Sequence, residues 1–370
     1  MAPTVDQQQE TTTTTGNFSS DDLKALCRAI EPEDAAIRQQ AQARLDNLTK
    51  PRGSLGKLEM LAARTCAITG RLDCHLSRKV ILTFAADHGV TEEGVSIFPP
   101  EVTCQMIHNF LGGGAGVNVL ARHAGAEVRV IDVGAAGDVE APGLIKRKVR
   151  PGTANIAKGP AMSEDEALAA IRVGIDSARD AIADGAGILG TGEMGIGNTT
   201  PSAALFAALL PVPVGQVTGL GTGLDERARQ HKVRVIEQAL AVNQARLARP
   251  LTALAAVGGL EIAAICGVIL EAAKSRVPVV VDGFISSAGA LAAMRLQPLA
   301  RDYCFFSHMS AEQGHKIFFA EMELEPLLHL DLRLGEGTGA ALAMGLVEAG
   351  LKIMNEMATF DEAGVSPSEN

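Results

Sequence analysis

The stretch GTGEMGIGNTTP at Gly190–Pro201 decides the fold class, because it joins two segments of different structure. Before it, Gly187–Leu189 is a short apolar run typical of a buried strand, and after it Ser202–Leu210 is rich in Ala and Leu and predicts a helix. A glycine-rich turn between a strand and a helix presents free backbone N–H groups at the helix N-terminus, where a phosphate can bind. A turn without any ligand is equally compatible with the spacing.

Gly190, Gly192 and Gly195 also spell G-x-G-x-x-G, the glycine pattern of dinucleotide-binding folds. In those folds an acidic residue about 20 positions later holds a ribose. The corresponding segment here, 209–214, reads LLPVPV and contains no acid, and Glu193 would place a carboxylate beside the pyrophosphate. We therefore predict a loop for one phosphate and keep an NAD-dependent oxidoreductase as the less favoured alternative.

The composition is that of a globular protein with an aliphatic core, since 47% of the 370 residues are hydrophobic while Trp is absent and Tyr occurs once. A net charge of −10 argues against binding to nucleic acid or to anionic membranes. No apolar run reaches the roughly 18 residues of a membrane span. The six cysteines are scattered and none forms C-x-x-C, so we expect reduced thiols in a cytoplasmic protein, without a zinc site.

The order of the helix and strand patterns predicts an α/β fold with a doubly wound parallel sheet. Residues 1–19 are rich in Gln and Thr, and we expect them to be disordered. Helical patterns fill residues 20–78, and with the last helix, at about 340–370, they are predicted to form a small helical domain. Between 79 and 339, continuous Val, Ile and Leu strands alternate with helices, which is typical of a parallel sheet covered on both faces.

Polar residues follow several of the predicted strands, which are Lys79–Ala86, Val128–Val133, Gly187–Leu189, Val277–Val281 and Asp302–Phe306. Ligands of such sheets lie at the carboxyl ends of the strands. We therefore expect the residues at these ends to converge on one crevice: Asp87, His88, Asp282 and Ser307. For His88 the simpler interpretation is a hydrogen-bonded histidine without a chemical role, because one His and one Asp do not make a metal site.

Two carboxylates, Glu193 and Glu336, are each flanked by glycines. A carboxylate in a glycine-lined pocket is partly desolvated, which raises its pKa and makes it a better base. Both residues precede predicted helices, and a helix dipole would lower the pKa instead. The sequence leaves this balance open, and it also leaves open that both residues lie on surface turns.

Lys232 lies on a predicted charged helix, 224–247, and is a natural partner for the phosphate, although a solvated lysine is the simpler interpretation. Phe98, Met106 and Met194 could line a flat apolar slot for an aromatic ring, because Met adapts to irregular surfaces. Ordinary core packing is the alternative, and it is favoured by spacing alone.

Six blocks of the sequence, in order, resemble the nicotinate-nucleotide–dimethylbenzimidazole phosphoribosyltransferase family, which makes the lower-ligand nucleotide of cobamides. They lie between about Asn47 and about Asn355 and read KPRGSLGKLE from Lys50, ADHGV from Ala86, GEMGIGNTTP from Gly192, VDGFISSA from Val281, SHMSAEQGH from Ser307 and LRLGEGTGAALAM from Leu332. The resemblance implies a doubly wound α/β domain, a small helical domain built from both ends of the chain, and a homodimer.

The resemblance also implies a reaction in which the 5-phosphoribosyl group of nicotinate mononucleotide moves to a nitrogen of 5,6-dimethylbenzimidazole, with inversion at the anomeric carbon and without a metal or other cofactor. Glu336 matches the family's general base, with Gly335 beside it, and Glu193 matches a glutamate beside the sugar. The phosphate is assigned to Lys232 and to Gly195, Ile196, Gly197, Asn198, Thr199 and Thr200. The base slot is assigned to Phe98, Met106, Met194 and Leu334. Variation in that slot leaves a purine or a phenolic as an alternative acceptor.

Overall fold

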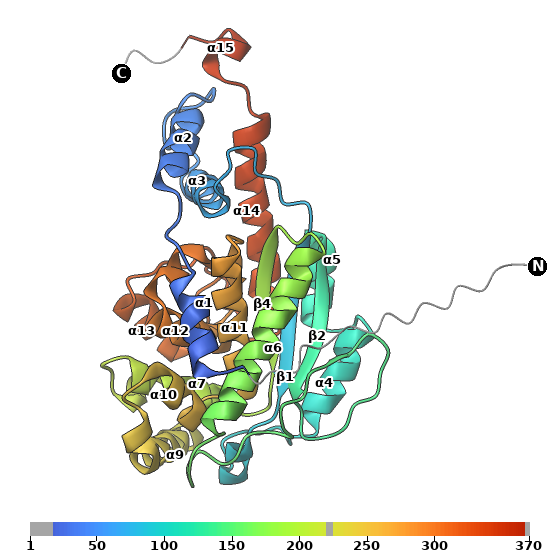
Figure 1. Ribbon diagram of the computed structural model, residues 1–370, viewed down its shortest axis with the longest axis vertical. Coiled ribbons are helices and arrows are strands. Elements are labelled where there is room, and N and C mark those ends of the chain that lie inside the picture. The colour runs from blue at the N-terminus through green and yellow to red at the C-terminus, as the bar shows by residue number, and fades with distance from the viewer. Residues whose placement is uncertain (1–17, 220–224, 367–370) are drawn as a thin grey trace, which may run out of the picture.

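The computed structural model describes residues 18–219 and 225–366, and it contains a six-stranded sheet in which every strand runs parallel to its neighbours (Figure 1). The strands occur in the order β3-β2-β1-β4-β5-β6. Their bounds are Lys79–Ala86 (β1), Ala126–Gly134 (β2), Ile145–Lys146 (β3), Ile188–Met194 (β4), Val279–Val281 (β5) and Cys304–Phe306 (β6). The predicted α/β fold with a doubly wound parallel sheet is confirmed.

The order of the strands reverses between β1 and β4, and this reversal places the site. β1 is buried along its whole length, as expected of an apolar strand covered on both faces, and it pairs with β2 on one side and with β4 on the other. The chain runs outward from β1 through β2 to β3, and from β4 through β5 to β6. The connections that leave the two central strands therefore turn to opposite sides and open a crevice at the carboxyl edge.

Helices cover both faces of the sheet (Figure 1). α6 (Glu164–Ala183), α11 (Leu260–Lys274) and α12 (Phe284–Leu296) pack together on one face. α4 (Val102–Leu111), α5 (Gly116–Ala124) and α14 (Thr338–Glu356) lie on the other. α11 is buried from Leu260 to Ala273 because it lies between the sheet, α6 and α12, and apart from Glu261 and Glu271 its buried residues are accordingly apolar.

The connection between β4 and β5 and the segment after β6 carry the remaining helices of the α/β body. These are α7 (Thr199–Leu209), α8 (Val214–Val217), α9 (Glu226–Asn243), α10 (Pro250–Val257) and α13 (Gln313–Glu321), with short 3-10 turns at Gly89–Glu93, Gln244–Arg246 and Pro298–Tyr303. Several short elements are not predicted from the sequence, among them α8, α10 and β3. α10 starts at a proline and is buried at every later residue, so its apolar run has no one-sided period, and β3 has only two residues.

α2 (Ala35–Asp46) and α3 (Lys57–Thr69) form a small helical unit with the end of α14, at the top of Figure 1. A separate buried cluster joins them: Ala41, Leu45, Leu48, Ala62, Ala63, Cys66, Cys74, Leu351 and Met354. α14 contributes to two cores, because its first part, including Met344 and Val347, packs in the core of the sheet. α15 (Phe360–Ala363) follows it. The division of the chain into two domains stays a prediction.

α1 (Ser20–Arg28) differs from the prediction, because it packs against α11 and not with α2 and α3. Its buried side chains belong to the core of the sheet: Leu23, Leu26 and Cys27. The N-cap residue of this helix is Ser19, so ordered structure reaches into the segment 1–19 that is predicted to be disordered. The remainder of that segment, 1–17, lies outside the described residues.

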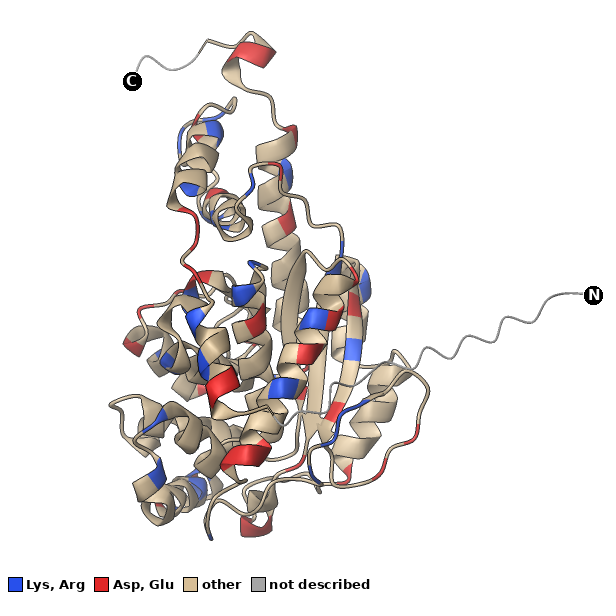
Figure 2. Cartoon of the chain, in the orientation of Figure 1, with Lys and Arg blue, Asp and Glu red and all other residues tan. Residues whose placement is uncertain are grey.

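Charged residues of both signs are interspersed on the outer helices. In Figure 2, acidic and basic positions alternate along α6, where Arg172 pairs with Asp176 and Arg179 pairs with Glu271 of α11. This mixing differs from the basic stripe that nucleic-acid-binding proteins present. Among the helices of the described segments, none has the length and apolarity required to cross a membrane.

Candidate active site

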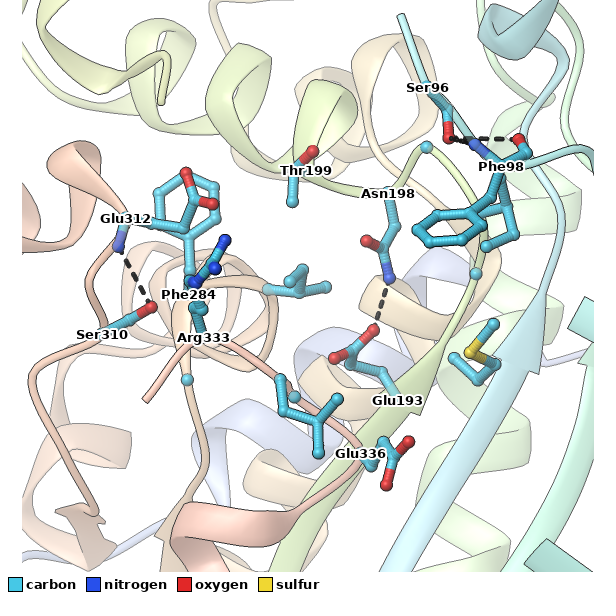
Figure 3. Close-up of a pocket in the computed structure, with 18 of the residues that line it drawn as sticks. Ser96, Phe98, Glu193, Asn198, Thr199, Phe284, Ser310, Glu312, Arg333 and Glu336 are labelled. Carbon is cyan, nitrogen blue, oxygen red and sulfur yellow. Dashed lines mark hydrogen bonds between the residues drawn. The ribbon is translucent and has the colours of Figure 1, made fainter. Parts of the chain in front are cut away.

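A cavity of about 340 Å³ opens at the carboxyl edge of the sheet (Figure 3). Segments at the ends of four strands contribute to its lining: 95–106 after β1, 193–199 at the end of β4, 283–285 after β5 and 308–312 after β6. The loop before α14, 333–336, completes it. The strand ends thus meet at one crevice, as a parallel sheet with this strand order requires.

The cavity has a polar end and an apolar end. In Figure 3, Thr199, Glu312 and Arg333 lie toward one side and Phe98 lies on the other. Glu193 and Glu336 lie between the two sides. A ligand with an anionic group at one end and an aromatic ring at the other would therefore pass both carboxylates.

Lys232 of α9 reaches the polar end, where its Nζ donates a hydrogen bond to Thr199 Oγ1 at 2.6 Å. Thr199 is the first residue of α7, so a buried cation lies beside the N-terminus of a helix, an arrangement that favours a phosphate. The side chain is 1% exposed, and the interpretation of Lys232 as a solvated lysine is therefore wrong. Burial lowers its pKa to about 8, and nearby Glu312 opposes this shift.

Most of the predicted phosphate loop lines the cavity, and one residue does not. The lining residues are Gly195, Ile196, Gly197, Asn198 and Thr199. Thr200 is fully buried and lies outside the lining. The difference arises because α7 begins at Thr199, so that the next residue already belongs to the helix and packs against the core.

β4 is longer than predicted, and this changes the meaning of the glycine pattern. The strand runs to Met194, so Gly190 and Gly192 lie inside it and only Gly195 follows it. A Cβ at Gly192 would lie 2.2 Å from the backbone oxygen of Glu336. Gly192 therefore permits the close approach of the loop before α14. The glycines do not form the strand-to-helix turn of a dinucleotide site.

Glu193 is 5% exposed at the end of β4, and its Oε2 accepts a hydrogen bond from Asn198 Nδ2 (Figure 3). Burial raises its pKa to about 8, with a further contribution from the acids Asp282 and Glu261, while the bond from Asn198 acts in the opposite direction. Glu193 is therefore mostly protonated at neutral pH when no cation lies beside it. A cationic ligand in the cavity would stabilise the carboxylate and displace this proton.

Glu336 is 6% exposed, and its Oε2 accepts a hydrogen bond from the backbone N–H of Val117 at 3.1 Å. Burial raises the pKa of Glu336, and the N–H groups of Val117 and Gly116 oppose that shift. Desolvation is therefore the larger of the two opposing effects. The helix whose N-terminus contacts the Glu336 carboxylate is α5, which begins at Gly116. It is not α14, the helix that Glu336 precedes in the sequence. Since Glu193 and Glu336 are both buried, the alternative of two surface turns is wrong.

The four residues predicted for the base slot all line the cavity: Phe98, Met106, Met194 and Leu334. Phe98 and Leu334 are 45% and 57% exposed, whereas the two methionines are half-buried. Val102 and Ile285 are further apolar residues of the cavity lining, whereas Phe284 lies beside Glu312 and Arg333 at the polar end (Figure 3). A slot of aromatic, aliphatic and thioether groups suits a flat aromatic ring.

Four predicted site residues are buried outside the cavity lining: Asp87, His88, Asp282 and Ser307. His88 Nε2 lies 2.8 Å from Glu261 Oε1, as expected for the simpler interpretation of this histidine. Ser307 Oγ donates to the carbonyl oxygen of Asp282 at 2.7 Å. The loop after β4 packs over His88, since a Cβ at Gly195 would lie 3.0 Å from its Nε2. Residues that directly follow a strand are therefore covered here by a neighbouring loop.

The lining also includes polar residues that are not predicted from the sequence: Arg333, Glu312, Ser310 and His308. Ser310 Oγ accepts the backbone N–H of Glu312 at 3.3 Å, which fixes the start of that segment. All four lie inside sequence blocks quoted above, but an isolated charged residue carries no signal for the direction of its side chain. Within residues 18–219 and 225–366, no group of three or more His, Cys, Asp or Glu side chains is arranged to hold a metal ion.

Known proteins match the chain over nearly its whole length. A family model described as Phosphoribosyltransferase matches residues 30–365. Nicotinate-nucleotide–dimethylbenzimidazole phosphoribosyltransferase of Geotalea uraniireducens (strain Rf4) is 61% identical and covers 94% of this chain and 99% of the relative. The protein of the same name from Geobacter sulfurreducens is 59% identical, with coverages of 94% and 98%. The crystal structure of CobT from Thermus thermophilus is similar at a TM-score of 0.86 and 50% identity, covering 90% of this chain and 100% of that one.

Proposed function

This chain belongs to the nicotinate-nucleotide–dimethylbenzimidazole phosphoribosyltransferases, which are pentosyltransferases, and we propose that it transfers the 5-phosphoribosyl group of nicotinate mononucleotide to 5,6-dimethylbenzimidazole. The products are α-ribazole 5′-phosphate and nicotinate, and the first is used to assemble the nucleotide loop of cobalamin. The observation that carries the proposal is a pair of buried glutamates between the polar and the apolar end of one cavity. Membership of this family excludes the alternative of an NAD-dependent oxidoreductase.

The polar end binds the 5′-phosphate of the mononucleotide. The Lys232 ammonium and the N-terminus of α7 supply the positive charge, and Thr199 supplies a hydroxyl group. A phosphate at this position raises the pKa of Lys232 from about 8 and keeps the lysine charged. The ribose then lies beside the two glutamates, and the acceptor ring occupies the apolar end.

Glu193 stabilises the charge that develops on the ribose. In the substrate the nicotinate ring is a cation, so its nitrogen leaves with the bonding electrons and needs no acid. The C–N bond to nicotinate breaks while the benzimidazole nitrogen attacks the opposite face of the anomeric carbon, which inverts. The cationic substrate displaces the proton of Glu193, and the resulting buried carboxylate faces an oxocarbenium-like transition state.

Glu336 removes the remaining proton. A benzimidazole that has attacked through one nitrogen is cationic and must lose the proton from its other nitrogen. The Glu336 carboxylate accepts this proton, and its burial supports the role because a raised pKa brings a carboxylate nearer to the working pH of a general base. Transfer of the proton to Glu336 leaves a neutral nucleotide base and a protonated glutamate.

The proposal is tested by comparing two acceptors in the Glu336→Gln variant. With an acceptor that carries an N–H, the rate should fall by roughly 100- to 10,000-fold, the usual contribution of a general base. 1-Methylbenzimidazole has no proton to lose, so its rate should depend much less on Glu336. Glu237→Gln, on the exposed surface of α9, is the matched control and should change neither rate. Equal losses for both acceptors would show that Glu336 acts by position or charge alone.

The same transfer to another aromatic base is the second candidate. The apolar slot formed by Phe98, Met106, Met194 and Leu334 favours dimethylbenzimidazole over a purine or a phenolic, since polar edges would be left without partners there. Incubation of enzyme and nicotinate mononucleotide with a mixture of bases, followed by mass spectrometry, decides between them. Preferential formation of a purine or phenolic nucleotide would overturn the assignment of the acceptor.

We further propose that the protein is a cytoplasmic homodimer. Large exposed apolar side chains lie at the cavity, among them Ile97, Phe98 and Leu334, and a second subunit would cover such a surface. All six cysteines are free, which fits a reducing compartment. Light scattering of the purified protein tests the dimer, and a monomer at micromolar concentration would contradict it.

A further inference from the structure

The loop that carries Glu336 has an unusual backbone. Gly335, Glu336 and Gly337 have φ angles of 84°, 67° and 106°, so three consecutive residues are in the left-handed region. Glycine adopts this region readily, but for a glutamate it is unfavourable, because the Cβ comes too close to the following carbonyl oxygen. Such a conformation persists only where the surrounding structure holds it in place.

Three contacts from three elements hold this loop. The N–H of Val117 donates to the Glu336 carboxylate at 3.1 Å, and Thr83 Oγ1 donates to the Glu336 carbonyl oxygen at 3.1 Å. The third contact comes from Asp282, whose Oδ2 accepts the N–H of Gly337 at 3.1 Å. This third contact acts on the backbone directly after Glu336.

Asp282 replaces the missing side-chain cap of α14. The residue at the N-cap position is Gly337, which has no side chain, so the carboxylate at the end of β5 does the capping instead. Its second oxygen, Oδ1, accepts the N–H of Ala340 at 3.0 Å. One side chain therefore contacts both the N-terminus of α14 and the left-handed loop.

Asp282 is itself firmly held and lies outside the cavity lining. It is 1% exposed, its N–H donates to Thr191 Oγ1 at 3.1 Å, and its carbonyl oxygen accepts from Ser307 Oγ. Burial raises its pKa to about 7, and the backbone N–H groups of α14 oppose this shift. The Asp282 carboxylate thus contacts the backbone that carries Glu336 and does not line the cavity, although it contributes to the raised pKa of Glu193.

We propose that Asp282 is a positioning residue for the transfer reaction: it fixes the left-handed loop and so places the Glu336 carboxylate at the acceptor's N–H. This inference rests on the proposed role of Glu336 as the general base. It predicts that Asp282 affects the rate through Glu336 and contributes little once that base has been removed.

A double-mutant cycle with Asp282→Asn and Glu336→Gln tests this inference. In the wild-type background, Asp282→Asn should lower kcat by ~100-fold with an acceptor base that carries an N–H, because a misplacement of about 1 Å can cost that much. KM for nicotinate mononucleotide should change by less than about 3-fold. In the Glu336→Gln background the same change should lower kcat by less than about 3-fold, because groups that act as one unit are not additive. Asp282→Ser retains an oxygen that can accept a hydrogen bond from a backbone N–H, in a smaller side chain. Its effect on kcat should depend on Glu336 in the same way.

Asp132→Asn is the matched control. Asp132 is also 1% exposed at the end of a strand, where its Oδ1 accepts the N–H of Ala135 at 2.8 Å, but its strand, β2, is separated from β5 by β1 and β4. This variant should retain the wild-type kcat. The inference would be overturned if Asp282→Asn and Asp282→Ser each lowered kcat by the same factor in the Glu336→Gln background as in the wild-type background. If Glu336→Gln alone leaves kcat unchanged, the proposed role of Glu336 fails instead.

Discussion

Replacing Glu193 with Gln should stabilise the substrate-free protein, and more strongly as the pH rises. Burial raises the folded-state pKa of Glu193 from its ordinary 4.5 to about 8. The folded chain therefore keeps a proton that the unfolded chain releases, so stability is largest below pH 4.5 and is lost as the pH rises toward 8. Gln is neutral at every pH and retains an oxygen that can accept the hydrogen bond from Asn198.

The size of the effect follows from the raised pKa. Between pH 6 and pH 8 the unfolded chain has lost the proton of Glu193 while the folded chain still holds most of it. Each pH unit then costs up to about 1.4 kcal/mol of unfolding free energy. Because Glu193 starts to ionise in the folded state near pH 8, the stabilisation by Glu193→Gln should be about 2 kcal/mol larger at pH 8 than at pH 6.

Urea unfolding of both proteins at the two pH values, followed by circular dichroism without substrate, measures this difference. Glu237→Gln is the control, because Glu237 is exposed on α9 and its replacement should have the same small effect at both pH values. A stabilisation by Glu193→Gln that does not depend on pH, or a loss of stability, would show that Glu193 is ionised in the folded protein. The proposal that a cationic substrate displaces the proton of Glu193 would then be wrong as well.

Three further predictions concern the cavity. Lys232→Ala should weaken binding of nicotinate mononucleotide by roughly 1.5–3 kcal/mol in calorimetry but barely affect the riboside without phosphate, and an equal loss for both would separate Lys232 from the phosphate. Since the pKa of Lys232 is lowered to about 8, the affinity of the wild-type protein for the mononucleotide should also fall as the pH rises past that value. The affinity of Lys232→Ala should not show this dependence on pH. Met106→Gln should change the ranking of acceptor bases in competition assays while mononucleotide affinity stays the same, and an unchanged ranking would place the slot elsewhere. Gly192→Ala should lower the unfolding free energy by about 1–3 kcal/mol and abolish most activity, because the new Cβ would meet the Glu336 carbonyl oxygen, and full activity would show that this loop can move freely.

The sequence by itself determined the class of fold and most of its elements. The bounds predicted for β1, Lys79–Ala86, are those observed, because a continuous apolar run between Gly, Pro and polar residues is a local signal. The capping box of α6, which joins Ser163 and Glu166, is a local feature of the same kind. The position of the cavity follows from the same kind of reasoning, since the carboxyl ends of parallel strands meet at one edge, but the four residues predicted from these strand ends lie outside its lining.

Only the tertiary structure decided what each carboxylate does. Glu336 takes its hydrogen bond from α5, 219 residues earlier in the chain, and Asp282 caps a helix whose N-cap residue, Gly337, lies 55 residues later. No local pattern encodes such contacts. The length of β4, the packing of α1 on α11, and the presence of Arg333 and Glu312 in the cavity have the same origin. In each case the direction of a side chain depends on which distant segment covers it, and burial against that segment, rather than residue type or spacing, sets its pKa and its chemistry.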